Sequence, residues 1–150
     1  MPDSLYRLIF LSRNAIPGDS EAKRREIERI LALSRPRNAR AGISGALLFN
    51  AGRFAQVLEG PRHALETLFE RIQCDPRHTD IVILIYEPIT QRSFAKWSMG
   101  HVAADTDAPQ HFAALEGTLD VDTRQRIGER VCALLQAHLL AGDTEPPKAR

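Results

Sequence analysis

The stretch that most constrains the fold of this chain is residues 42–60, GISGALLFNAGRFAQVLEG. Its first run, residues 43–49, is almost entirely apolar, which is typical of a strand covered on both faces. Residues 50–52 form a three-residue loop whose glycine can take a positive φ. The alternating run that follows carries the uncharged polar residue Gln56 at its middle. The stretch therefore predicts an antiparallel hairpin with one amide side chain in its second strand.

Gln56 has two interpretations. It shares one face of its strand with Phe54 and Leu58. If this is the core face, the carboxamide is buried and its donors and acceptor need partners. No charged residue lies within two positions of it, so such a partner must come from elsewhere in the fold or from a ligand. Alternatively, Gln56 lies on an edge strand and faces water, as most glutamines do.

Composition excludes several classes of protein. The 150 residues suit one domain, and 43% hydrophobic residues with a net charge of +1 argue against disorder and against nucleic-acid binding. No run of about 18 apolar residues and no signal peptide is present, so we expect no membrane segment and a cytoplasmic location. Cys74 and Cys132 are expected to be buried thiols in a reducing compartment. The five histidines show no metal-ligand spacing.

The remaining elements follow from hydrophobic period and from helix end signals. We expect a first helix from about residue 20 to Ser34, ended by Arg35-Pro36, with residues 37–41 as a polar connector. A second helix starts with Pro61 as its first residue and ends near Cys74. Further strands are expected at residues 5–12, 81–86 and 97–102. This βαββαββ order predicts an α+β fold, a ferredoxin-like sheet of four to five strands with both helices on one face.

The character of the chain changes after residue 103. We therefore divide it into residues 1–103 and a C-terminal helical extension and tail, residues 104–150. Two helical stretches are expected in the extension, and the second, about residues 122–140, has a strongly apolar face. Since the second face of the sheet is also apolar, this helix is predicted to cover it. The alternative is that part of the helix forms a homodimer contact.

Polar side chains gather where helices and strands are expected to meet. If the two helices pack side by side on the sheet, the slot between them has apolar walls, and Asn38 and Gln56 lie at one end. Cations would be available there for a phosphate tail, so the slot suits a planar heteroaromatic ligand. Singly, each polar residue also has an ordinary interpretation, such as a turn or a helix stop. The predicted walls are Ile30, Leu68 or Phe69, and Leu8, and the candidate anion partners are Arg71, Arg77 and His78.

Five motifs in this order and spacing resemble the BLUF family, the bacterial blue-light sensors that use FAD. They are LYRLI, NARAGISG, FAQVLEG, DPRH and FAKWSM, and the resemblance covers about residues 4 to 102. It implies a ferredoxin-like domain that holds an isoalloxazine ring between its two helices. The extension resembles the variable C-terminal helices of short, single-domain members.

The resemblance also implies residue roles. Gln56 matches the glutamine that bonds the flavin near N5 and C4=O and rearranges on illumination, and Asn38 matches the asparagine at the C4=O and N3 edge. Trp97 and Met99 match a pair of which one lies near the glutamine and relays its switch. The remaining cofactor-binding residues are expected at Ile30, Ser34, Arg71, Asp75, Arg77 and His78.

Phe10 departs from the family pattern. It stands where the family has a photoactive tyrosine, whose phenol gives an electron and a proton to the excited flavin and fixes the orientation of the glutamine. Tyr6 cannot substitute, because four residues along a strand is about 13 Å. Trp97 cannot donate a phenolic proton. We therefore predict a flavin protein whose usual red-shifted state is lost or altered, whether Phe10 is natural or an engineered change.

The resemblance implies a sensor rather than an enzyme, with FAD as cofactor and FMN or riboflavin as alternatives. We expect a homo-oligomer that signals to a separate partner protein, since no output module follows before residue 150. Two alternatives are a cofactor-free interaction module and an acylphosphatase-like hydrolase, in which Asn38 with Arg71 or Arg77 would bind phosphate. No glycine-rich anion loop supports the hydrolase.

Overall fold

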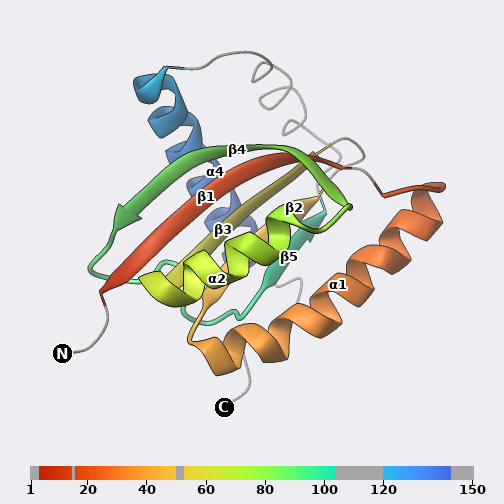
Figure 1. Cartoon of the computed structure of the whole chain (residues 1–150), viewed down its shortest axis with the longest axis horizontal. Coiled ribbons are helices and arrows are strands. Elements are labelled where there is room, and N and C mark those ends of the chain that lie inside the picture. The colour runs from red at the N-terminus through yellow and green to blue at the C-terminus, as the bar shows by residue number, and fades with distance from the viewer. Residues whose placement is uncertain (1–3, 15, 50–52, 104–119, 143–150) are drawn as a thin grey trace.

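A single five-stranded sheet with helices on both faces forms the described part of the chain (Figure 1). The structure is a computed structural model that describes residues 4–14, 16–49, 53–103 and 120–142. The strand order is β4-β1-β3-β2-β5. The elements are β1 (Leu5–Asn14), α1 (Ser20–Ala41), β2 (Ser44–Phe49), β3 (Arg53–Pro61), α2 (Arg62–Gln73), β4 (His78–Pro88), β5 (Gly100–Ala103) and α4 (Val121–Gly142). This order confirms the predicted α+β, ferredoxin-like fold.

Strand β3 lies at the centre of the sheet. It pairs antiparallel with β1 and with β2, which confirms the hairpin, while β5 joins the far side of β2 in parallel. The loop predicted at residues 50–52 lies outside the described residues. Gly45 sets how closely the two hairpin strands approach, because a Cβ built there would lie 2.1 Å from the Val57 carbonyl oxygen. Only glycine fits at this position.

Helix α1 is longer than predicted, and this changes where the site residues lie. It continues through Pro36 to Ala41 and ends at Gly42, whose φ of 75° is the left-handed geometry of a helix C-cap. The predicted stop at Pro36 and the polar connector at residues 37–41 are therefore wrong. Proline removes one N–H···O bond of the helix ladder, but side-chain contacts to the segment before β5 hold the last two turns. Asn38 is thus a helix residue.

Other boundaries also differ from the sequence prediction. Pro61 ends β3 and is the N-cap of α2 rather than its first residue. Strand β4 is longer than residues 81–86. The predicted fifth strand at residues 97–102 begins only at Gly100, because residue 97 is irregular and residues 98 and 99 form a bend. Cys74 is exposed rather than buried, and Cys132 is partly buried.

The sheet separates two apolar cores. Helices α1 and α2 cover one face, where Leu31 and Leu65 pack on side chains of β1, β2 and β3. Helix α4 covers the other face, where Val131, Leu135 and Leu139 pack on β1, β2 and β3 residues. This confirms that the C-terminal helix covers the second face, so its apolar stripe gives no argument for a homodimer contact. The first helical stretch of the extension lies outside the described residues.

No helix in the described ranges is long and apolar enough to cross a membrane.

A candidate ligand cleft between α1 and α2

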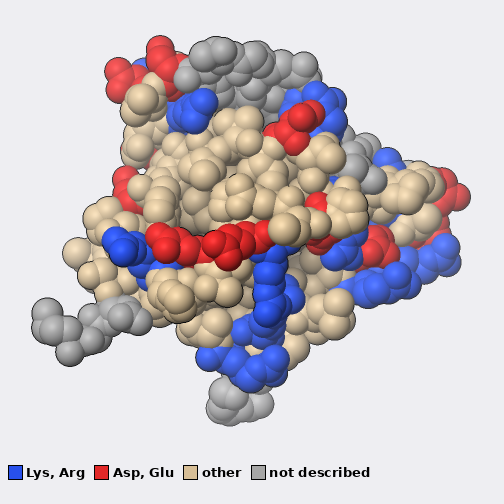
Figure 2. All heavy atoms as spheres, viewed as in Figure 1, with Lys and Arg blue, Asp and Glu red and all other residues tan. Residues whose placement is uncertain are grey.

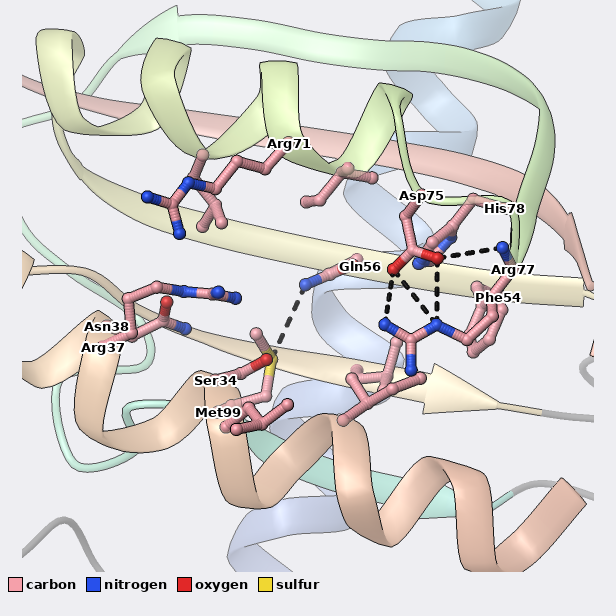
Figure 3. A pocket seen from close by; sticks show the side chains of 15 residues that line it. Ser34, Arg37, Asn38, Phe54, Gln56, Arg71, Asp75, Arg77, His78 and Met99 are labelled. Carbon is pink, nitrogen blue, oxygen red and sulfur yellow. Dashed lines mark hydrogen bonds and ion pairs between the residues drawn. The ribbon is translucent and has the colours of Figure 1, made fainter.

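A cleft of about 200 Å³ opens between α1 and α2 above the centre of the sheet (Figure 3). All of the residues predicted to bind a cofactor line it, namely Ile30, Ser34, Asn38, Gln56, Arg71, Asp75, Arg77 and His78. They come from both helices, from β3 and from the turn into β4. In Figure 3, Arg37, Asn38 and Arg71 lie at one end, Asp75, Arg77 and His78 lie at the other, and Gln56 points between them.

Gln56 is buried on the central strand β3, with 6% of its surface exposed. The edge-strand interpretation is therefore wrong. Its Nε2 donates to the Met99 sulfur at 3.8 Å. A thioether is a weak acceptor, so the carboxamide has a poor partner in a nearly water-free place. A ligand with carbonyl and N–H groups along one edge would satisfy it much better.

Asn38 is almost fully buried on the last turns of α1. Its Nδ2 donates to the Ser98 carbonyl oxygen at 2.8 Å, which fixes the plane of the amide. The Oδ1 acceptor then remains for a ligand donor in the cleft. On the preceding turn, Arg35 Nε donates to the Met99 carbonyl oxygen at 3.0 Å. Both contacts attach the C-terminal half of α1 to the segment that carries Met99.

Ion pairs between α1 and the turn before β4 close one end of the cleft. Arg77 donates to both carboxylate oxygens of Asp75, and its Nη1 reaches Glu26 Oε2 of α1 at 2.5 Å. Burial alone would raise the pKa of Asp75, but the hydrogen bonds and charge of Arg77 outweigh it and hold that pKa below its usual value. The hydrogen bond that Arg77 donates to the Asp75 carboxylate raises the pKa of Arg77. Arg77 is thus largely neutralised by the protein itself.

His78 is a buried, neutral ring at the same end of the cleft. Burial lowers its pKa to about 4, and the nearby Asp75 only partly opposes this. The Ser12 hydroxyl and His78 Nδ1 are 2.8 Å apart and share a hydrogen bond. The ring lies 4.4 Å from the Phe54 ring, centroid to centroid. His78 therefore serves the cleft as a flat neutral wall rather than as a cation.

Phe10 is the direct neighbour of Gln56 on the adjacent strand. The two residues are partners in the antiparallel β1–β3 register. The phenyl ring is completely buried, and it packs edge-on against Phe69 with centroids 5.4 Å apart. As register partners, Phe10 and Gln56 lie on the same face of the sheet, but Phe10 is not among the residues that line the cleft, and it carries no hydroxyl.

Trp97 and Met99 lie on opposite sides of the sheet. Met99 lines the cleft and contacts Gln56, whereas Trp97 packs in the core under α4. Residues 97–99 are not extended strand, so the alternation of side chains in a strand does not apply to them. The short segment before β5 therefore touches both the cleft and the C-terminal helix.

Several lining residues were not predicted from the sequence. Leu33, Leu47, Ile72 and above all Arg37 line the cleft, and Arg37 was missed because the helix was expected to stop before it. Of the predicted walls, Ile30 and Leu68 line the cleft, whereas Leu8 and Phe69 line a separate hollow beyond α2. The i, i+3, i+4 pattern of α1 carried past Pro36 would have placed Arg37 correctly.

Glu59 is a further residue that the sequence did not single out. Its carboxylate is fully buried and accepts hydrogen bonds from Arg7 and from the backbone N–H groups of Ser93 and Phe94. Because residues 93 and 94 belong to the connection between β4 and β5, this carboxylate anchors the segment that leads to Met99.

A buried amide on the central strand, an amide on α1 and an apolar-walled cleft between two helices form a site that suits a planar ligand with a carbonyl and N–H edge. The chain belongs to the BLUF family: the model of BLUF, "Sensors of blue-light using FAD", matches residues 5–100. Domains of this family are sensory modules, and they bind a flavin.

Individual relatives carry the domain beside other parts. The chain is 36% identical over 97 residues to the photoactivated adenylate cyclase subunit beta of Euglena longa. The matched stretch covers 64% of this chain and 11% of the relative. It is also 36% identical over 87 residues to the blue light- and temperature-regulated antirepressor BluF of Escherichia coli. This match covers 58% of this chain and 21% of that protein. The chain thus spans about a tenth of the cyclase subunits that it matches.

Solved structures agree with the fold over most of the chain. The dark-state structure of BlrB, a BLUF protein, superposes with a TM-score of 0.69 at 36% identity, covering 94% of this chain and 98% of BlrB. The ground state of BlsA gives a TM-score of 0.71 at 29% identity, covering 88% and 87%.

Proposed function

We propose that this chain is a flavin-binding photoreceptor domain that signals through the Gln56 amide to a separate protein, and that its photocycle is lost or altered because Phe10 takes the place of the photoactive tyrosine. The observation that carries the proposal is Gln56 itself. It is buried on the central strand, it faces the cleft, and the weak Met99 sulfur is its side-chain partner.

The residues of the cleft fit a flavin ring. Leu68, Ile72 and Phe54 offer flat apolar contact, while Asn38 and Gln56 offer amides to a carbonyl and N–H edge. A flavin bound here would supply the absorption of blue light. FAD is the expected form, with FMN and riboflavin as alternatives. The hydroxyl that hydrogen-bonds to His78 belongs to Ser12, which is fully buried and does not line the cleft, so this pair offers no nucleophile to a ligand; this supports a sensor rather than an enzyme.

The Gln56 carboxamide can present either its oxygen or its NH₂ group to the ring edge. Its orientation depends on the neighbours that donate to it or accept from it. Met99 can only accept weakly, and Phe10 can do neither. Position 10 lies opposite Gln56, and phenylalanine there has no hydroxyl. It can neither donate a proton to a flavin nor hydrogen-bond to the Gln56 amide after that amide has rotated.

A change at Gln56 would reach the C-terminal helix through the segment before β5. Met99 contacts Gln56, Trp97 packs beneath α4, and Gly100 lies against Leu139 of α4. We propose that α4 and its extension present the output surface to the partner protein, and that the sensor acts in the cytoplasm as a homo-oligomer. The relatives named for cyclase and antirepressor activity indicate what kinds of effector such a domain can serve.

Two measurements test this function. The purified protein should be yellow and release a flavin when denatured. The Phe10→Tyr variant, loaded with the same flavin, should show a red-shifted absorption band after blue illumination, and the unsubstituted protein should not. Tyr6→Phe is the matched control and should leave both spectra unchanged.

A colourless protein that fails to bind added flavin would overturn the proposal and favour an interaction module. A flavin-loaded Phe10→Tyr variant without the shift would show that residue 10 does not hold the photoactive position.

A further inference from the structure

A buried carboxylate holds the connection between β4 and β5 against the sheet. Acidic side chains lie at the surface on the face shown in Figure 2, whereas Glu59 is fully buried. It follows Gln56 by three residues on β3, so its side chain points to the opposite face, which α4 covers. Its two oxygens accept from the backbone N–H groups of Ser93 and Phe94, each at 2.9 Å. Arg7 on β1 supplies the counter-charge, with its Nη2 2.8 Å from Oε2.

Arg92 extends this attachment to the end of α1. Its Nη1 donates to the Ser44 hydroxyl on β2 and to the Glu59 backbone carbonyl, and its Nη2 donates to the Gly42 carbonyl at 2.7 Å. The Ser44 hydroxyl in turn donates to Glu59 Oε1. Residues 92–94 are thus attached to β2, to β3 and to the C-cap of α1 by charge-assisted hydrogen bonds, which are the stronger kind in proteins.

The end of the connection that reaches β5 is held differently. The Trp97 ring packs in the core under α4, and its indole Nε1 is buried without a hydrogen-bond partner in the part of the chain that the structure describes. The Trp97 carbonyl accepts from the Gly45 N–H, while the carbonyls of Ser98 and Met99 accept from side chains of α1. This end is therefore attached to α1 beside the cleft, and the other end is attached to the central strand through Glu59.

From this arrangement we infer that Glu59 is a positioning residue for the coupling between the cleft and α4. It fixes one end of the connection on β3, so that a displacement of Met99 moves Trp97 and the contact of Gly100 with Leu139. The inference rests on the proposed function and adds the residue on which transmission from the cleft depends. Without the carboxylate, the connection would move with α1 as a loose segment, and a change in the cleft would not reach α4.

Glu59→Gln is the direct test, because the groups that contact this carboxylate donate to it. The amide NH₂ of a glutamine would find donors where it needs acceptors, so the N–H of Ser93 or Phe94 would lose its partner. Arg7 would lose its counter-charge as well. The side chain keeps its size, so the change acts on hydrogen bonding and charge rather than on packing.

The chain contains two natural reporters of this position. Trp97 is its one tryptophan, and Met99 and Met1 are its two methionines. In flavin-free protein, Glu59→Gln should shift the Trp97 fluorescence to longer wavelength, since the ring loses part of its cover from water. It should also move the Met99 methyl resonance in spectra of methionine-labelled protein. Arg92→Gln, which leaves the carboxylate in place, should move both signals by less, and it provides the test if Glu59→Gln does not fold.

A second measurement follows transmission to α4. FMN is added to saturation in the dark, so that differences in affinity between variants do not matter. The methyl resonances of Leu139 are then recorded, because this side chain lies against Gly100 at the end of the connection. They should shift on FMN binding in the unsubstituted chain, and this shift should be lost in Glu59→Gln.

Two controls separate positioning from stability and from charge. Leu65→Ala empties space in the core under α2, next to the hollow beyond that helix, and should lower stability without moving either reporter. Glu87→Gln removes a partly exposed carboxylate from the register partner of Arg7 on β4. It should leave both reporters and the Leu139 response unchanged.

Reporters that move no further in Glu59→Gln than in Leu65→Ala would overturn the positioning role. A Leu139 shift that persists in Glu59→Gln, or that is absent from the unsubstituted chain with FMN bound, would overturn the coupling while flavin binding stands. Failure to bind FMN, FAD and riboflavin alike would overturn the proposed function and the coupling together. The flavin-free reporters would then still show whether Glu59 positions the connection.

Discussion

Gln56 shows how a single amide can be placed in readiness for a ligand. The central strand removes it from water, its neighbours on the same face are apolar, and its partner Met99 satisfies it only weakly. Leaving a buried polar group poorly paired costs stability, and a domain that binds a ring edge there recovers that cost. In the proposed function, the side chain opposite on β1 then determines what the amide can do next, and in this chain that side chain is Phe10.

His78 makes the stability of the domain depend on pH. Burial lowers its pKa from 6.5 to about 4. Between these pH values, His78 therefore binds a proton in the unfolded chain but not in the folded state. The contribution of neutral His78 to the free energy of unfolding is therefore fully present above about pH 6.5. It is lost as the pH falls through this window, and the loss is roughly 3 kcal/mol. In urea unfolding at pH 7 and pH 4, His78→Gln should show a correspondingly smaller loss than the unsubstituted chain.

The exposed His63 provides the control for this measurement. His63→Gln should keep the full pH dependence, because His63 is exposed on α2 and its substitution leaves the buried ring of His78 in place. If His78→Gln lost as much stability as the unsubstituted chain on acidification, the buried neutral state of His78 would be refuted.

At the residue scale, much of the site could be predicted from the sequence. Gln56 and Asn38 stood out as uncharged amides beside apolar runs, and the DPRH turn marked the other end of the cleft. The choice between Trp97 and Met99 could not be made, because it depends on a turn without a fixed side-chain period. The pairing of Arg77 with Glu26 could not be predicted either, since the two residues lie 51 positions apart.

Helix α1 is the element on which the cleft most depends. It forms one wall, and polar contacts attach it at both halves: Glu26 to Arg77 in the first, and Arg35 and Asn38 to the segment before β5 in the second. The sequence pattern predicts that this helix ends at Pro36, because a proline destabilises a helix interior. Tertiary contacts outweigh that local cost here. These contacts cannot be predicted from the local sequence pattern, because they involve residues far away in the chain.

Glu26 should act as a positioning residue for this wall. Glu26→Gln removes the charge that ties Arg77 to α1, so the closed end of the cleft should open more often. A partly exposed ion pair of this kind contributes about 1 kcal/mol, which corresponds to a roughly fivefold faster flavin dissociation. Stopped-flow displacement of the bound flavin measures this rate.

Glu28→Gln is the comparison variant, because Glu28 pairs with Arg24 on the outer surface of the same helix. It should leave the dissociation rate unchanged. Equal rates for Glu26→Gln and the unsubstituted chain would mean that the ion pair does not hold the cleft closed.

For the whole molecule, the sheet separates the proposed ligand side from the proposed output side. The cleft and its apolar surroundings lie on the α1–α2 face, whereas α4 and Trp97 form the other core. The sequence predicted this division correctly, since both faces of the strands were apolar and the C-terminal helix had to be covered. What it could not show is that residues 97–100 connect the two sides.

This partition predicts that stability and flavin affinity respond separately to core substitutions. Leu135→Ala empties space under α4 and should cost 2–5 kcal/mol of unfolding free energy, the usual range for a buried leucine. Its flavin dissociation constant, measured on the folded protein, should stay unchanged. Leu68→Ala, which removes a wall of the cleft, should lower the unfolding free energy and raise the flavin dissociation constant. If Leu135→Ala weakened flavin binding as much as Leu68→Ala, the sheet would transmit packing changes directly, and the segment of residues 97–100 would not be the specific connection between cleft and α4.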